Sequence, residues 1–130
     1  MEVAALRYKG QYADVVMLLP DEPESMGDIL DAVISHYHLG QEQAARKYLD
    51  QLIKIANERS DGFTNVAAAL AQMNEPDRAM EYLEKAVEVR EVNNAFIRID
   101  PDLPPLHSDP RFLQLLERLG LKPPLNQERR

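Results

Sequence analysis

The residue types best suited to chemistry gather in one short stretch, "IDPDLPPLHSDPRF", at positions 99–112. It contains three aspartates, four prolines, a histidine and an arginine. Asp100 and Asp102 have a paired spacing that can hold a divalent metal, because carboxylate oxygens are ligands that hard cations prefer. His107 together with Asp109 could serve acid–base chemistry. The stretch therefore raises the question of a catalytic or metal site.

The rest of the chain does not supply what either chemistry requires. The paired-aspartate spacing occurs in metal-dependent transferases that hold a nucleotide sugar in a mixed α/β domain, whereas no segment here alternates with the period of a strand. Neither a nucleophile nor an oxyanion hole accompanies His107. Aspartate followed by proline is also ordinary turn chemistry. We therefore expect Leu103 and Leu106 to attach a proline-stiffened loop to the core, and we expect no catalytic residue, metal site or cofactor.

The remaining histidines and the main acidic run also favour structural roles. His36 and His38 lie two residues apart, so on a helix they point to different faces and cannot share a metal as an i, i+4 pair can. His36 falls on the inner stripe of its helix, where we expect a satisfied core histidine. Four glutamates at helical spacing are expected to form a solvated face. They are Glu81, Glu84, Glu88 and Glu91.

Composition argues against several other classes of protein. A chain of 130 residues is about one domain, and 45% apolar residues fit a globular fold. The formal net charge of −7 argues against nucleic acid, whose binders usually carry a basic face. No apolar run approaches the ~20 residues of a membrane span, and the first residues are not a basic signal-peptide start. The chain has no cysteine, which excludes disulfides and suits a cytoplasmic location.

The elements that must position these residues form an internal repeat. Residues 26–59 align without a gap on residues 60–93, with similar residues at equivalent places. The shared pairs are Ala45 with Ala79, Tyr48 with Tyr82 and Leu49 with Leu83. Apolar residues recur at steps of three and four in both stretches, which is the period of an amphipathic helix. Each stretch therefore predicts a helical hairpin, and the predicted fold class is all-α.

Helix-capping and turn residues predict where these helices begin and end. Ser25, followed three residues later by Asp28, predicts a capping box at the start of the first helix. Gly40 and Asn74 can adopt the left-handed conformation that ends a helix. Pro76 suits the first turn of the helix that follows. The two hairpins are therefore expected to turn near positions 40 and 74.

This pattern resembles the tetratricopeptide repeat family. The second stretch matches at Phe63, Val66, Ala67, Leu70, Ala79, Leu83 and Ala86, and the first at Ile29, Ala32, Val33, Ala45 and Leu49. Small residues at such positions let the two helices and the next repeat approach closely. The first stretch departs from the family pattern at His36, where an aromatic residue is usual, and at Leu52, where alanine is expected. The family's proline near the repeat end is replaced by Asn57 and Glu91. The resemblance implies a short solenoid of helical hairpins.

Segments on either side of the two repeats, 26–93, complete the predicted organisation. Residues 1–25 are expected to hold a degenerate hairpin, and their abrupt start predicts that the chain was cut from a longer protein. Residues 94–121 are expected to form a loop and a capping helix, because the end of a hairpin array needs its apolar face covered. Its apolar stripe is Phe112, Leu115, Leu116 and Leu119. Similar segments close the repeat arrays of bacterial signalling and regulatory proteins. Residues 122–130 are expected to form a flexible tail.

The resemblance also implies a function. In the family, the first helix of each repeat lines a concave face, and its outward residues contact a protein or peptide. Carried over to this chain, these positions are Leu30, Ile34, Tyr37 and His38 in the first repeat and Asp61, Thr64, Ala68, Ala71 and Gln72 in the second. The basic clamp of chaperone-binding members is not expected, because its positions hold Leu30 and Thr64. A ligand with an apolar anchor near Tyr37 and a basic or amide-rich portion beyond it is expected. The chain is thus predicted to be a non-catalytic, protein-binding scaffold.

Three alternatives stay open at this point. The N-terminal hairpin could fold over Leu30 and Ile34, which would make both residues part of the core. The chain could instead be a regulatory domain of a larger signalling protein, acting by self-association into a homo-oligomer or by packing on a catalytic domain. A small α-helical enzyme is the least favoured alternative.

Overall fold

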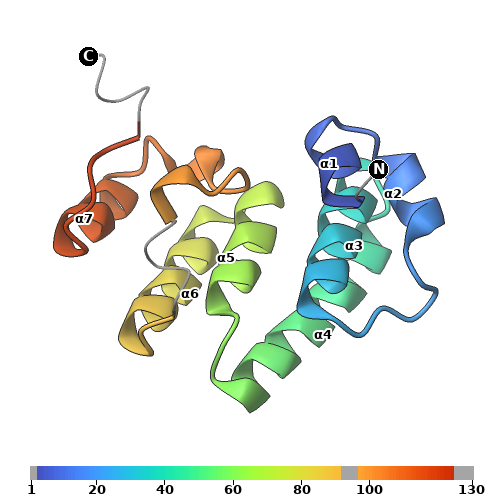
Figure 1. Cartoon of the computed structure of the whole chain (residues 1–130), viewed down its shortest axis with the longest axis horizontal. Coiled ribbons are helices and arrows are strands. Elements are labelled where there is room, and N and C mark those ends of the chain that lie inside the picture. Colours follow the sequence, from blue (N-terminus) through green and yellow to red (C-terminus); the bar gives the residue numbers. More distant parts are fainter. Residues whose placement is uncertain (1–2, 92–96, 125–130) are drawn as a thin grey trace.

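The computed structural model describes residues 3–91 and 97–124, and all regular structure in these ranges is helical. The elements are α1 (Val3–Tyr8), α2 (Tyr12–Leu18), α3 (Met26–His38), α4 (Glu42–Arg59), α5 (Phe63–Gln72), α6 (Pro76–Glu88), the 3₁₀ helix η2 (Pro104–Leu106) and α7 (Pro110–Arg118) (Figure 1). The prediction of an all-α fold is confirmed. No helix in these ranges is both long and apolar enough to cross a membrane. Most of the predicted tail, residues 125–130, lies outside the described residues.

Consecutive helices pack as hairpins that stack on one another. α3 pairs with α4 and α5 pairs with α6, while both α3 and α4 also contact α5. Figure 1 shows the hairpins following one another along the long axis, with α1 and α2 near one end and α7 at the other. Each hairpin thereby buries an apolar stripe that it could not bury alone.

The helix boundaries coincide with the predicted capping and turn residues. The Ser25 hydroxyl accepts a hydrogen bond from the backbone N–H of Asp28 at 3.1 Å, which satisfies a free donor at the start of α3. Gly40 and Asn74 lie in the left-handed region, with φ angles of 80° and 60°. Pro76 is the first residue of α6. Both hairpins therefore reverse where the sequence predicts a turn.

Equivalent alanines of the two hairpins are buried between helices. Ala45 and Ala79 have no exposed surface, and neither has Leu83 beside Ala79. Protein interiors are packed as densely as organic crystals, so an added side chain here has no space to occupy. The size of these residues is therefore part of what allows the hairpins to form.

We expect Ala79→Leu to lower the free energy of unfolding by about 1–3 kcal/mol, because the added carbons overpack the α5–α6 hairpin. Thermal unfolding followed by circular dichroism measures this loss. Ala13→Leu, at an exposed position of α2, is the matched control and should leave the midpoint nearly unchanged. Ala71, which the sequence placed on an open face, cannot be the control because it is buried as well. Equal tolerance at Ala79 and Ala13 would contradict this packing.

α7 closes the C-terminal end of the stack. The Asp109 carboxylate accepts a hydrogen bond from the backbone N–H of Arg111 at 2.9 Å and so caps the first turn. α7 contacts α6, and its apolar stripe enters the core through Phe112, Leu115 and Leu116, which are fully or almost fully buried. The helix therefore covers apolar surface that the last hairpin would otherwise expose.

Candidate functional site

The face shared by α3 and α5 is where the sequence placed the ligand-contacting residues. Five of them do not form an open surface, since the exposed fractions are 8% for Leu30, 1% for Ile34, 2% for Thr64, 2% for Ala68 and 3% for Ala71. The physical reason is that α1 and α2 pack against α3, and η2 packs against α5. For Leu30 and Ile34 the structure therefore supports the alternative in which the N-terminal hairpin covers them. Whether the face binds a ligand stays a prediction.

The other four predicted residues lie at two separate places. Asp61 is exposed just before α5 begins. Tyr37 is half-buried near the C-terminal end of α3, with its ring edge-on to the exposed His38 at 5.6 Å. The half-buried Gln72 at the end of α5 is brought close to His38, with its Oε1 3.1 Å from His38 Nε2. The structure thus gathers three of these residues and leaves Asp61 apart.

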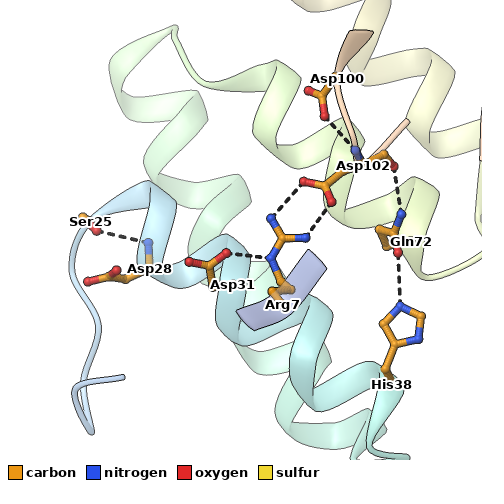
Figure 2. A network of polar contacts seen from close by, with 8 residues as sticks. All are labelled: Arg7, Ser25, Asp28, Asp31, His38, Gln72, Asp100 and Asp102. Atoms are coloured by element: carbon orange, nitrogen blue, oxygen red, sulfur yellow. Dashed lines mark hydrogen bonds and ion pairs between the residues drawn. The ribbon is translucent and has the colours of Figure 1, made fainter. Parts of the chain in front are cut away.

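A buried ion-pair cluster, which sequence reasoning missed, closes the same face. The Arg7 guanidinium of α1 donates from Nε to Asp31 Oδ1 at 2.7 Å, and from Nη1 and Nη2 to the two carboxylate oxygens of Asp102 at 2.6 and 3.0 Å. All three residues are buried. Bidentate contacts between an arginine and a carboxylate are strong and geometrically specific. Figure 2 shows Arg7 between the two carboxylates. We call Arg7, Asp31 and Asp102 the clasp.

Further polar contacts extend from the clasp along the face. Gln72 Nε2 donates to the backbone carbonyl of Asp102 at 3.0 Å, while the other end of the same amide faces His38 (Figure 2). The Tyr12 ring stacks on His38 with 4.6 Å between ring centroids. These contacts join α2, α3, α5 and the loop before η2. His38 and Gln72, two of the predicted ligand residues, therefore already have partners within the chain.

The clasp and its surroundings carry more negative than positive charge. Asp100 lies beside Asp102, and its Oδ1 accepts a hydrogen bond from the Asp102 backbone N–H at 2.9 Å. Burial by itself lowers the pKa of Arg7, but the hydrogen bonds and charges of Asp102 and Asp31 outweigh burial and raise it, so the guanidinium stays protonated. Burial raises the pKa of Asp31 and of Asp100, because Arg7 compensates their charge only in part. The loss of water around these two carboxyls therefore opposes closure of the face.

We expect Asp100→Asn to raise the unfolding midpoint at pH 7, because asparagine keeps the oxygen that accepts from Asp102 and removes the charge. The folded-state pKa of Asp100 lies above the unfolded value of 3.8, so its ionisation destabilises the fold. That penalty is absent below pH 3.8 and complete above the folded-state pKa. Thermal unfolding should therefore show a gain that disappears near pH 3. Asp61→Asn, at an exposed position, is the control. A variant less stable than wild type at pH 7 would contradict this assignment.

An opening of about 340 Å³ remains beside the clasp. Its lining residues are Tyr8, Leu30, Asn65, Ile99, Asp100, Pro101 and Asp102. Tyr8 and Ile99 flank it with 54% and 66% of their surface exposed. Tyrosine combines a large apolar contact area with a polar tip and is enriched where proteins meet. An accessible part of the face therefore lies here, between α1 and the loop at residues 99–102.

Glu91 holds the start of α5, which is a second feature that sequence reasoning missed. Gly62, the residue at the N-cap, has no side chain to accept from the first backbone donors. The Glu91 carboxylate accepts instead from the backbone N–H groups of Phe63 and Thr64 at 2.6 and 3.2 Å and from the Thr64 hydroxyl at 2.8 Å. Glu91 is buried, so the expectation of a solvated face is wrong for this glutamate, whereas the other three of the run are exposed.

The loop with the candidate catalytic residues is attached to the core. Leu103 and Leu106 are fully buried, as expected. The His107 ring stacks on Phe112 with 5.4 Å between centroids, and burial lowers the pKa of His107. Within residues 3–91 and 97–124, no three His, Asp or Glu side chains are arranged to hold a metal. The contacts seen for this loop are packing, helix capping, and the contacts of Asp102 with Arg7 and Gln72.

One sequence signal could have indicated the clasp. Asp31 interrupts an apolar run on α3, between Leu30 and Ala32. A carboxylate at such a position needs a buried partner, because an unpaired charge is expensive to remove from water. The partner itself could not be read from the sequence, since Arg7 and Asp102 are 95 positions apart.

Stacked helical hairpins closed by a terminal helix define a helical-repeat protein. Residues 63–93, which include α5 and α6, match the tetratricopeptide repeat model, so the resemblance is confirmed over this stretch. Members of the family serve in general as protein-interaction scaffolds. The predicted similarity of the C-terminal ending to bacterial signalling proteins is not tested by this match. No curated protein and no solved structure matches the chain significantly.

Proposed function

We propose that this chain is a protein-binding scaffold whose α3–α5 face takes a short segment of another protein, with no catalytic step of its own. The observation that carries the proposal is that this face already contacts an irregular segment of the chain itself. Residues 100–106 lie on it, and Gln72 donates to a main-chain carbonyl within them. Main-chain contacts add affinity for a bound segment, while side-chain contacts add specificity.

The residues proposed to contact the partner differ in part from those expected from the repeat alone. Tyr8 and Ile99 beside the opening are exposed, and Tyr37 and Asp61 are also accessible to a partner. The buried members of the predicted set supply the floor of the face instead. They are Leu30, Ile34, Thr64, Ala68 and Ala71. An exposed tyrosine and isoleucine suit apolar anchors of a bound segment.

Selection from a library of displayed random peptides, with the full chain as bait, tests the proposal. We expect enriched peptides whose capture falls at least ~10-fold in Tyr8→Ala and in Ile99→Asp, with helical circular dichroism unchanged because both side chains are exposed. Met17→Ala is the matched control, since Met17 is exposed on α2, away from this face. Failure to enrich any peptide, or equal capture by the Tyr8 variant, would contradict the proposal.

Self-association is a second candidate function, favoured by the exposed apolar side chains of Met17 and Leu18 on α2. If copies of the chain pair through this surface, light scattering over a concentration series should show a dimer that Leu18→Glu abolishes. A wild-type chain that stays monomeric throughout the series would exclude this candidate. A cytoplasmic location, which the lack of cysteine suits, belongs to the same set of proposals.

A further inference from the structure

The segment at residues 100–106 contacts the α3–α5 face in the manner of a bound ligand. The Asp102 carboxylate pairs with Arg7, and the Asp102 main-chain carbonyl accepts from Gln72. Leu103 and Leu106 are fully buried within the core cluster that contains Ala68 and Ala71 of α5. A charge pair, a main-chain hydrogen bond and apolar anchors are contacts by which binding faces hold short peptide segments.

The groups that receive this segment come from other parts of the chain. Arg7 is supplied by α1 and Gln72 by α5. Asp31 accepts from Arg7 Nε and so orients the guanidinium, which leaves Nη1 and Nη2 directed at a second carboxylate. Arginine in this geometry is preorganised for bidentate recognition of a carboxylate. The basic group that the repeat positions Leu30 and Thr64 lack is therefore present, contributed by α1.

The segment has few regular backbone hydrogen bonds. It consists of a turn and the three-residue helix η2. Elements with few backbone hydrogen bonds open at a lower free energy than core helices. Burial of Asp31 and Asp100 opposes closure further, since it raises the pKa of both carboxyls. Opening of the segment would return these carboxylates to water.

We propose that residues 100–106 are an internal occupant of the α3–α5 face, and that a partner protein binds by presenting a segment of the same chemistry in their place. That segment has an aspartate followed by leucines and prolines that can adopt the turn and short 3₁₀ helix of residues 100–106. Arg7 selects the aspartate, and the buried surface of α5 takes the leucines. This inference rests on the protein-binding function proposed above and names the class of partner.

The probe is a fluorescein-labelled peptide of residues 97–107, IRIDPDLPPLH, titrated into the full chain. In wild type the tethered segment competes at an effective concentration on the order of millimolar, so the peptide should bind weakly. Asp102→Asn weakens the internal contact, and this variant should bind the peptide at least ~10-fold more tightly than wild type. A peptide with asparagine at the position of Asp102 should not show this gain. Adding Arg7→Met to the Asp102→Asn chain should abolish the gain in affinity for the unchanged peptide.

Hydrogen exchange on the wild-type chain keeps the test decisive if Asp102→Asn fails to fold. The backbone N–H groups of Leu103 and Leu106 bond within the segment to the carbonyls of Asp100 and Leu103. They should exchange at least ~10-fold faster than the backbone of α5 and α6. Exchange at the rate of the core would overturn the inference, because the segment would then leave only on global unfolding.

Two further outcomes would also overturn it. One is equal peptide binding by wild type and by Asp102→Asn. The other is a dimer of the variant, seen by light scattering, that the peptide does not dissociate, since the face would then belong to a second copy of the chain. Capture of unrelated random peptides without binding of IRIDPDLPPLH would overturn this inference alone and leave the protein-binding function standing.

Discussion

Phe112→Ala is expected to lower the free energy of unfolding by about 3–5 kcal/mol, because it removes a fully buried ring and leaves a cavity that relaxes only in part. The ring stacks on His107 and lies in one core cluster with Leu115 and Leu116 of the same helix. A domain of this size has a total stability of about 5–15 kcal/mol. The loss should therefore appear as a large fall in the urea and thermal midpoints.

Leu113→Ala is the matched control on the same helix. Leu113 is partly exposed, so less apolar area returns to water when it is truncated. Urea unfolding of both variants, followed by circular dichroism, gives the comparison. Equally small losses at Phe112 and Leu113 would mean that α7 does not close the core.

Arg7→Met is expected to cost about 3–5 kcal/mol, because it leaves Asp31 and Asp102 buried without a cation. Methionine keeps much of the side-chain volume, so the loss reports the charge rather than a cavity. Arg111→Met is the control, since Arg111 also pairs with two carboxylates but is exposed to solvent. Exposed pairs contribute little, so this control should hardly change the midpoint.

Urea unfolding at pH 7 distinguishes the two arginines. A loss for Arg7→Met no larger than that for Arg111→Met would be inconsistent with a buried cluster. Backbone hydrogen exchange of the Arg7→Met variant shows where the loss arises. If exchange becomes faster in α1 alone, the damage lies in the N-terminal hairpin and the two repeats remain folded.

The helices and their turns could be predicted because their signals are local. Ser25, Gly40 and Asn74 act on backbone groups within a few residues of themselves. The steps of three and four between apolar residues follow from the period of the helix. Close packing at Ala79 follows from the same register, because a small residue recurs at the equivalent position of both repeats.

The closed state of the α3–α5 face could not be predicted, because it depends on segments far apart in sequence. Leu30 has the same neighbours along α3 whether solvent or α1 covers it, so helical spacing does not separate the two cases. Glu91 was misplaced for a related reason. α6 ends at Glu88 and Arg90 adopts a left-handed φ of 58°, which turns the chain out of the helical register before Glu91.

The clasp also fixes how many repeats the domain can hold. Arg7 precedes the first repeat and Asp102 follows the second, yet their side chains are in contact. An inserted hairpin would add two helices with axes about 8–10 Å from their neighbours, which is more than an arginine side chain can span. Repeat arrays ordinarily gain or lose units by duplication and deletion, since each unit contacts only its neighbours. Here such an event would separate the two ends, so copy number is constrained by a contact that lies outside the repeats.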